Sequence, residues 1–335
     1  MRESSAMQSH HPMTVGERAT IAVLAGGVGA ARFLHGLLRV RQATNVTAIV
    51  NVGDDFTLHG LNISPDLDTV TYTLADQINP ETGWGRAGET WRVLTELGRL
   101  GGQDWFKLGD LDLALHLFRT QRRSEGASLS QVTGEIAARF GLELRLLPVS
   151  DDAIATRITP AEPDGAAEID FQEYFVAHQH GIAVSSIRFA GIDAAKPAPG
   201  VLDALRDAET VVVAPSNPFV SIGPVIDVPH VRETLASRRG SVIAVSPIVG
   251  GEAIKGPAGA MMRELGHEPS VVGVARLYAG FASTLVIDHA DAVLAGEVAQ
   301  AGMTPVVTDT IMADPDRAAS LARVTLDAAS ARGIT

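Results

Sequence analysis

The stretch TIAVLAGGVGAARFLHGLLRV, residues 20–40, decides the fold of this chain. Its first part, residues 20–25, is a short apolar run of the kind that forms a buried strand of a parallel sheet. Three glycines follow within residues 26–29, and leucines then recur at helical spacing. Residues 46–52 form a second apolar run. The opening therefore predicts a strand–turn–helix–strand unit, which requires a right-handed crossover and parallel strands.

Later segments continue the alternation. Further strands are expected over residues 210–214, 241–246, 270–274 and 284–287, and helices over residues 89–100, 111–122, 202–208 and 314–329. A helix that ends before Gly141 is expected to have Ser130 as its N-cap. Residues 144–190 instead hold short strand-like runs, EIDFQEYFV among them, with no long helix between them.

The chain as a whole predicts an α/β fold. We expect a doubly wound, Rossmann-like, mostly parallel sheet with an inserted β-rich and helical region at roughly residues 130–200. Residues 1–18 are polar and unpatterned and are expected to be a disordered N-terminal extension. Residues 19–335 are expected to form one large domain.

Composition excludes several classes of protein. The 335 residues include 27 basic and 39 acidic side chains, a net charge of −12, and no cysteine. The absence of cysteine excludes disulfides, Cys-ligated zinc or iron–sulfur sites and cysteine nucleophiles. The acidic balance argues against a nucleic-acid partner. No apolar stretch is long enough for a membrane span, and residues 21–25 lead into a glycine loop rather than a cleavage site, so we expect a cytoplasmic protein that binds no membrane.

The first candidate site is the glycine turn made by Gly26, Gly27 and Gly29. Glycines between a strand and a helix let backbone N–H groups approach an anion, and the helix dipole favours phosphate there. As a dinucleotide fingerprint the turn is imperfect, since Arg32 stands where the third glycine belongs. The glycines can alternatively serve only the packing of strand against helix.

The second candidate is an acidic loop. Asp54, Asp55, Asp66 and Asp68 lie within 15 residues of one another. Several carboxylates around one loop suit a hard divalent cation such as Mg²⁺. A solvated loop, or aspartates that cap turns and helices, is the alternative.

Other candidates follow strand ends or precede helices. They are Ser216 and Asn217 in PSNP, Lys255 in a glycine-rich loop, Lys107 and His116 in KLGDLDLALH, and the tryptophans Trp84 and Trp91. The carboxyl ends of parallel strands share one edge of a sheet, so the glycine turn, the acidic loop and the loops at 215–218 and 247–251 are expected to converge. For Ser216 and Asn217 the alternative is a simple turn, and for Lys255 it is a lysine in solvent. For His116 the alternative is a structural role, and for the two tryptophans it is packing in the core.

Taken together, six stretches resemble the 2-phospho-L-lactate transferases of coenzyme F420 biosynthesis. They are LAGGVGAARFLHGL (24–37), NVGDDFTLHGLNISPDLDTVTYTLA (51–75), GWGRAGETW (83–91), KLGDLDLALHLFRT (107–120), APSNPFVSIGPV (214–225) and SPIVGGEAIKGPAGAMM (246–262). The resemblance implies that a ribityl hydroxyl of the deazaflavin FO attacks a phosphorus of a guanosine diphosphate-linked donor carrying 2-phospholactate or phosphoenolpyruvate. GMP leaves, and F420-0 or its dehydro form results. It also implies Mg²⁺ as cofactor and a homodimer.

The resemblance also assigns residues to roles. It implies catalytic roles for Asp68 and Asp55, contacts to FO from Asp68 and Lys107, and metal ligation by Asp55 and Asp66. The donor's phosphates and guanosine would be held by Gly26, Gly27, Gly29, Ser216, Asn217 and Lys255.

Two other functions compete with this reading. A non-catalytic nucleotide-sugar-binding regulator of the gluconeogenesis-factor type shares the glycine turn and the Asp-Asp pair, but continues with a Gly-Gly-Ser-Ser run where this chain has FTLHGLNISPDLDT. A nicotinamide dehydrogenase is disfavoured by the missing third glycine.

Overall fold

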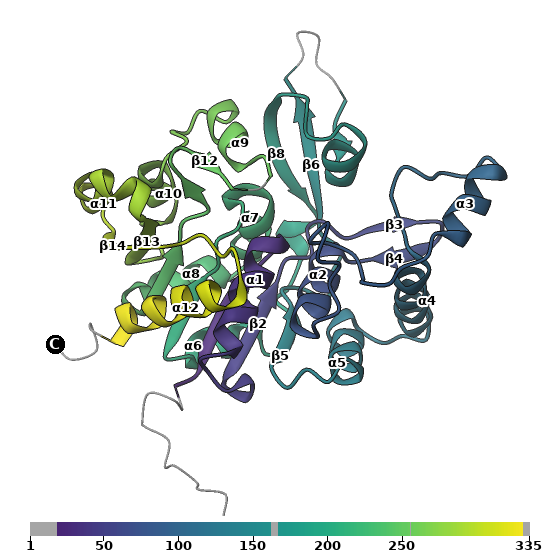
Figure 1. Cartoon of the computed structure of the whole chain (residues 1–335), viewed down its shortest axis with the longest axis horizontal. Coiled ribbons are helices and arrows are strands. Elements are labelled where there is room, and N and C mark those ends of the chain that lie inside the picture. The colour runs from purple at the N-terminus through teal and green to yellow at the C-terminus, as the bar shows by residue number, and fades with distance from the viewer. Residues whose placement is uncertain (1–18, 162–166, 255, 331–335) are drawn as a thin grey trace, which may run out of the picture.

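A seven-stranded parallel sheet forms the centre of the protein (Figure 1). The computed structural model describes residues 19–161, 167–254 and 256–330, so the expected disordered extension at 1–18 and Lys255 lie outside the described residues. The sheet order is β14-β13-β10-β9-β1-β2-β5, and every neighbouring pair is parallel. Its strands are β1 (Ile21–Ala25), β2 (Val46–Val50), β5 (Arg145–Pro148), β9 (Thr210–Val213), β10 (Val242–Val245), β13 (Thr284–Asp288) and β14 (Thr304–Thr308). The predicted α/β, Rossmann-like architecture is confirmed.

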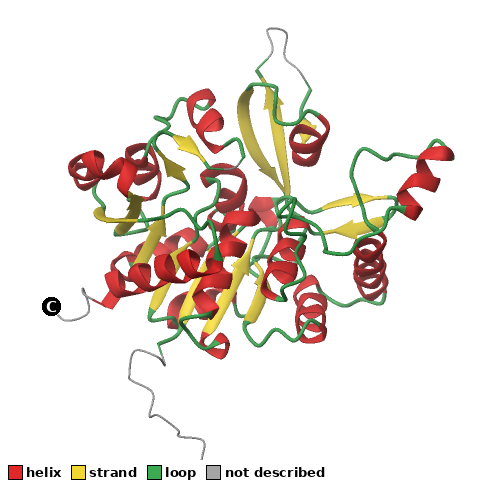
Figure 2. Cartoon of the chain, in the orientation of Figure 1, coloured by secondary structure: helices red, strands yellow, loops and turns green. Residues whose placement is uncertain are grey.

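Helices cover both faces of the sheet, as Figure 2 shows in red around the yellow strands. This explains why β1, β9 and β10 read as unbroken apolar runs, since every residue in each is buried. The helices that pack on the sheet or its edges are α1 (Gly27–Leu38), α2 (Pro65–Leu74), α5 (Leu129–Arg139), α6 (Val201–Asp207), α7 (Gly223–Ile226), α8 (Val231–Ser237), α9 (Ala258–Glu264), α10 (Val271–Tyr278), α11 (Ala295–Gln300) and α12 (Pro315–Ser330). Helices α1 and α12 pack so closely that a Cβ on Gly36 would lie 2.3 Å from the carbonyl carbon of Ala318.

The order of the strands creates a switch point. From β1 the chain proceeds outward to β2 and β5 on one side, then returns to β9 and proceeds to β10, β13 and β14 on the other. The loops that leave β1 and β9 therefore diverge at the carboxyl edge of the sheet, which is where open α/β sheets bind ligands.

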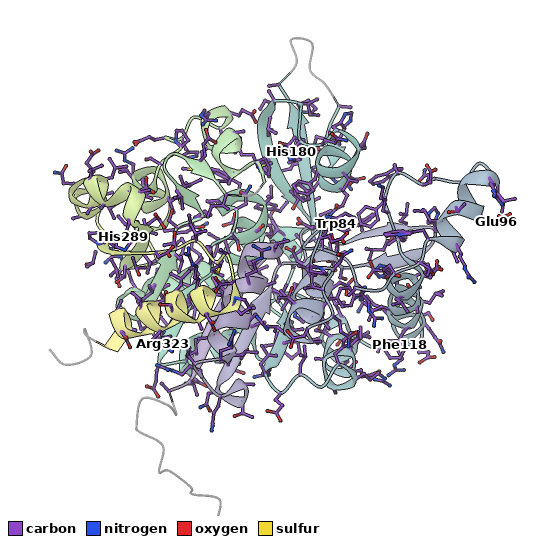
Figure 3. All side chains as sticks on the ribbon, in the orientation of Figure 1. Trp84, Glu96, Phe118, His180, His289 and Arg323 are labelled. Carbon is purple, nitrogen blue, oxygen red and sulfur yellow. The ribbon has the colours of Figure 1, made fainter. Side chains whose placement is uncertain are left out.

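A second group of elements extends from the sheet beyond β2. The hairpin of β3 (Phe56–Leu58) and β4 (Leu61–Ile63) packs against α4 (Asp110–Ser124), while α3 (Arg92–Arg99) stands away from the body (Figure 1). Figure 3 places Glu96, a residue of α3, at the outer end of this group of elements, which we call the arm. Helix α3 buries none of its own residues.

The inserted region is a small separate sheet. Its strands are β6 (Ala155–Pro160), β7 (Ile169–Asp170) and β8 (Val184–Ala190), in the order β7-β6-β8 and antiparallel. This stretch is narrower than the expected 130–200, because β5 pairs with β2 in the main sheet. Within EIDFQEYFV only Ile169–Asp170 is a strand, and Glu173–Ala177 forms a π-helical turn.

Two local predictions were wrong. Residues 270–274 were expected to be a strand but begin α10, whose N-cap Ser270 accepts hydrogen bonds from Val272 and Gly273 N–H. A short apolar run does not by itself distinguish a buried strand from a buried helix. The N-cap of α5 is Ser128 rather than Ser130, because Ser128 and Gln131 form a reciprocal capping box.

Two remaining strands, β11 (Ile248–Val249) and β12 (Glu252–Ala253), form a short antiparallel pair after β10. Across the ranges that the structure describes, none of the helices combines the length and apolar character needed to cross a bilayer.

Candidate active site

The glycine turn after β1 meets the loop after β9. A Cβ on Gly29 would lie 2.2 Å from the carbonyl oxygen of Pro215, so only glycine permits this approach. The hydroxyl of Ser216 donates a 2.7 Å hydrogen bond to the carbonyl oxygen of Gly26. The expected convergence of these two segments at the switch point is confirmed.

The glycine turn presents a backbone amide to an anionic group of the protein itself. Gly27 has a φ of +69°, a left-handed conformation that favours glycine, and its N–H donates to Asp66 Oδ1 at 2.8 Å. A Cβ on Gly26 would lie 2.9 Å from Asp66 Oδ2. The turn therefore binds an anion in the manner expected for a phosphate, with a carboxylate from the first turn of α2 in that place.

Asn51, which follows β2 directly, joins three segments at this point. Its side-chain amide donates to Asp66 Oδ2 at 2.9 Å and to the carbonyl oxygen of Val220 at 3.3 Å. Its side-chain oxygen accepts from Gly53 N–H at 2.7 Å. Asn51 is fully buried, and we had assigned it no role; a polar side chain at the end of an apolar strand was the available signal.

The turn at Asp54 and Asp55 holds carboxyl oxygens without partners. Asp54 is 7% exposed and Asp55 is half-buried. The Ser64 hydroxyl donates to Asp55 Oδ2 at 2.7 Å, but Oδ1 of Asp54 and Oδ1 of Asp55 have no hydrogen-bond partner among the described residues. An unpaired buried polar atom is costly, so these oxygens point to a group that the chain itself does not supply.

The raised pKa values of the carboxyl groups at this turn also indicate a missing partner. Burial, and then the Asp66 carboxylate, raise the pKa of Asp54 well above its usual range. Burial likewise raises the pKa of Asp55 well above its usual range, and raises the pKa of Asp66 to about 6. Bringing three buried carboxyl groups together favours either protonation or a bound cation.

The small inserted sheet closes over the same turn. The N–H of Thr156 on β6 donates to the carbonyl oxygen of Gly53 at 2.7 Å, and the Gln172 side chain donates to the carbonyl oxygen of Asp54 at 3.4 Å. Thr156 is 2% exposed, and its hydroxyl also has no hydrogen-bond partner among the described residues. The inserted region therefore belongs to the wall of the site, which the sequence did not indicate.

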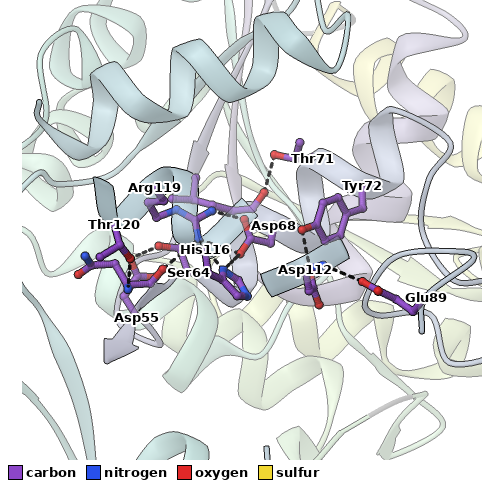
Figure 4. A network of polar contacts seen from close by, with 12 residues as sticks. Asp55, Ser64, Asp68, Thr71, Tyr72, Glu89, Asp112, His116, Arg119 and Thr120 are labelled. Carbon is purple, nitrogen blue, oxygen red and sulfur yellow. Dashed lines mark hydrogen bonds and ion pairs between the residues drawn. The ribbon is translucent and has the colours of Figure 1, made fainter. Parts of the chain in front are cut away.

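Asp68, two residues after Asp66 in the first turn of α2, has a different environment (Figure 4). The guanidinium of Arg119 on α4 donates to both carboxylate oxygens, to Oδ2 at 3.1 Å, and both residues are almost completely buried. Nη1 of Arg119 also lies 3.1 Å from His116 Nδ1 and donates to the carbonyl oxygen of Asn62 at 3.3 Å. Asp68 is thus a compensated buried anion.

His116 contributes to this network as a neutral ring. Burial lowers the pKa of His116 to about 4. Since a guanidinium can only donate, Nδ1 accepts and the ring proton resides on Nε2. His116 is one of the candidates that the sequence offers, whereas Arg119 is not. The signal was available: the two residues are three apart on a helix, beside the buried Leu115.

The remaining candidates fall into two groups. The side chains of Ser216 and Asn217 already bond within the fold, since Asn217 Oδ1 accepts from Phe219 N–H at 2.9 Å and its amide contacts the Met261 sulfur at 3.3 Å. Lys107 is exposed in the loop before α4. Trp84 and Trp91 are 45% and 41% exposed, so the alternative of core packing was wrong for both.

The residues present fit a hard cation only in part. No group of three or more histidine, aspartate or glutamate side chains within the described ranges is arranged as a complete metal site. The unpartnered oxygens of Asp54 and Asp55, with Asp66 beside them, are nevertheless the donors that Mg²⁺ prefers. Mg²⁺ is commonly bound through one or two carboxylates plus water and substrate phosphates, and that partial set matches what is seen here.

Comparison with known proteins supplies the family. The family model described as 2-phospho-L-lactate transferase CofD matches residues 21–325. A phosphoenolpyruvate transferase of Streptomyces griseus is 44% identical over 312 residues, which are 92% of this chain and 98% of that protein. Those of Kitasatospora aureofaciens and Thermobifida fusca are each 42% identical, over 91% and 92% of this chain and 96% and 97% of their own lengths.

The fold alone is shared with more distant structures. Two crystal structures of a Bacillus halodurans protein, a member of the UPF0052 family, superpose with TM-scores of 0.61 and 0.59 at 17% identity. They cover 92% and 91% of this chain and 99% of the other.

Proposed function

The chain belongs to the 2-phospho-L-lactate transferase CofD family, transferases of coenzyme F420 biosynthesis, and on that premise we propose the specific reaction that it performs. It transfers a phosphoenolpyruvate or 2-phospholactate moiety from a guanosine diphosphate-linked donor to the deazaflavin FO. The names of its relatives support phosphoenolpyruvate as the acid. Dehydro-F420-0 would then be the product. The observation that carries the proposal is the hydrogen bond between the glycine turn and the Asp66 carboxylate, at the switch point of the sheet.

The proposed step is a displacement at phosphorus. A ribityl hydroxyl of FO forms a bond to the phosphorus that carries the acid, the bond from that phosphorus to GMP breaks, and the hydroxyl proton passes to a base. Phosphoryl transfer depends on positioning and charge neutralisation more than on covalent chemistry of the protein. The turn of Gly26, Gly27 and Gly29 would hold the donor's phosphates, as its contact with Asp66 indicates it can hold an anion.

Asp55 and Asp66 are the proposed metal ligands, with Asp54 adjacent. When bound, Mg²⁺ would neutralise charge on the donor's phosphates. Binding a phosphate at the Gly27 amide would release Asp66 from that hydrogen bond and leave its oxygen for the cation. The raised pKa values of these carboxyl groups support a cation as their missing partner.

Asp68 and Lys107 are proposed to bind the acceptor. Each carboxylate oxygen of Asp68 accepts from Arg119 and retains a further lone pair for a ribityl hydroxyl. In this proposal Asp68 orients the attacking hydroxyl and takes its proton. Ser216, Asn217 and Lys255 would hold the guanosine and phosphates of the donor.

We also propose a cytoplasmic homodimer. Helix α3 buries none of its own residues; Val93 on it is 49% exposed, and Leu100, the C-cap residue that follows it, is 79% exposed. A second copy would cover this face. Sedimentation of the wild type against a Val93→Glu, Leu100→Glu variant tests this, and a dimer that persists in the variant argues against the arm as the interface.

One assay tests the function. Purified protein is mixed with FO, Mg²⁺ and each synthetic donor, and GMP and the deazaflavin product are followed by chromatography. Release of GMP that requires FO is the expected result. Binding of donor without any turnover would instead indicate a non-catalytic nucleotide-binding protein.

A further inference from the structure

Arg119 is a buried cation. It is 2% exposed, and its guanidinium faces Asp68 across the space between α4 and α2 (Figure 4). A buried charge is costly unless it is paired and its donors are satisfied. Arg119 meets that condition through the Asp68 carboxylate, the Asn62 carbonyl and the His116 ring.

The pairing is the kind that fixes orientation. A guanidinium that donates to both oxygens of one carboxylate holds that carboxylate in a single plane. Asp68 lies in the first turn of α2, and Asn62 lies on β4 of the hairpin. Arg119 therefore connects α4 to both α2 and β4.

The other residue proposed to bind the acceptor, Lys107, lies in the loop just before the same helix. Helix α4 begins at Asp110, three residues after Lys107. The Glu89 carboxylate accepts from Leu111 and Asp112 N–H, each at 2.8 Å, and so fixes the start of the helix. The start of α4, next to the loop that bears Lys107, is therefore held by Glu89 rather than by Arg119.

We propose that Arg119 is a positioning residue for the acceptor: it holds the Asp68 carboxylate in the one orientation that receives the acceptor. The inference rests on the proposed function, since the acceptor is FO. Arg119 touches no substrate itself and acts through Asp68. Burial raises the pKa of Asp55 and the Arg119 charge opposes that rise, so donor binding should be unchanged in Arg119→Lys, which keeps that charge.

The test compares two Arg119 variants with a matched control. Arg119→Lys keeps the charge and loses the forked geometry, and Arg119→Gln loses the charge. Tyr72→Phe is the control, because the Tyr72 hydroxyl donates to Asp112 Oδ1 at 2.6 Å and so ties the same two helices without touching Asp68. The dissociation constant of FO, followed by deazaflavin fluorescence, is measured beside that of the donor.

The expected result is a split between the substrates. Both Arg119 variants should weaken FO by about tenfold or more, in the range for a lost hydrogen bond to a charged group, and Arg119→Lys should leave donor affinity unchanged. Tyr72→Phe should change neither. In an Asp68→Asn background, Arg119→Lys should cause no further loss of FO affinity, because the two residues act as one unit.

Several outcomes would overturn the inference. Additive losses in the Asp68→Asn background would show that Arg119 does not act through Asp68. Equal losses for donor and FO, or a similar loss in Tyr72→Phe, would show general damage to the packing of the helices. If neither Arg119 variant folds while Tyr72→Phe does, Arg119 serves the fold and the inference fails. Failure of the proposed function is separate, because then the wild type itself releases no GMP with FO and donor.

Discussion

The two ends of the acidic segment have buried carboxylates in opposite electrostatic situations. Asp68 is paired with Arg119, whereas Asp54, Asp55 and Asp66 form no ion pair within the ranges that the structure describes. The residue type is the same throughout, and Asp54, Asp66 and Asp68 are equally buried, so among these three only the neighbours differ. A compensated carboxylate is held as an anion and can orient a partner, while uncompensated ones call for a proton or a cation.

The largest effect is expected at the uncompensated end. Asp55→Asn keeps the shape of the side chain and removes a charge from the proposed Mg²⁺ site, so turnover should fall by about 10³-fold, since a catalytic metal contributes several kcal/mol. Treatment of the wild type with EDTA should have a comparable effect that added Mg²⁺ reverses. GMP release is the measurement. If the variant and the EDTA-treated enzyme both keep full turnover, the metal assignment is wrong.

The compensated end should respond in a different way. Asp68→Asn should lower the chemical step by roughly 10²-fold, the range for losing a general base, and leave donor and metal binding nearly intact. Single-turnover rates at saturating FO, with calorimetric titration of the donor, measure both. The variant also leaves Arg119 without its anion, so the protein should melt at a lower temperature and must be assayed below it.

Asp55→Asn is the matched control for stability. Burial raises the pKa of Asp55 more than the Ser64 hydrogen bond and the Arg119 charge lower it, so Asp55→Asn should not lower the melting temperature of the metal-free protein. An Asp68→Asn enzyme with wild-type chemistry, or one that simply loses its metal, would contradict the division of roles between the two ends.

The two lysines should divide between the substrates. Lys107→Ala should weaken FO by about tenfold and Lys255→Ala should weaken the donor by a similar factor, as expected for a hydrogen bond to a charged group. Each variant should leave the other substrate nearly unaffected. Equal effects of either variant on both affinities would disprove the division.

The smallest effect is a dependence of stability on pH. A carboxyl group whose pKa is raised in the folded state stabilises the protein below its unfolded pKa, and that stabilisation is lost as the pH rises through the folded pKa. Burial, opposed by the Tyr72 hydrogen bond, raises the pKa of Asp112 to about 7, and that of Asp66 is about 6. Without Mg²⁺, the free energy of unfolding should therefore fall by about 1 kcal/mol between pH 6.5 and 8.

Calorimetric melts with and without Mg²⁺ would measure this dependence. The cation should stabilise more at pH 8 than at pH 6.5, because protons compete for the same carboxyl groups. A metal-free protein whose stability rises with pH over this range would show that Asp66 and Asp112 do not govern it.

Local patterns in the chain were sufficient to predict the frame of the site. The apolar run, glycine turn and helix at residues 20–40 specify a parallel strand and its helix, because hydrophobic period and glycine geometry are properties of neighbouring residues. Since parallel strands end at one edge, the meeting of Gly29 with Pro215 and the closeness of Gly27 to Asp66 followed from that frame.

The tertiary structure alone decided how the acidic residues differ. Asp68 and Arg119 are 51 positions apart, and nothing in the local pattern shows that their side chains meet. Likewise, Thr156 reaches the Asp54 turn only because the inserted sheet folds back over it. Burial and ion pairing are set by contacts between distant segments, so identical residues in one short loop acquire different charges and roles only when the chain is folded.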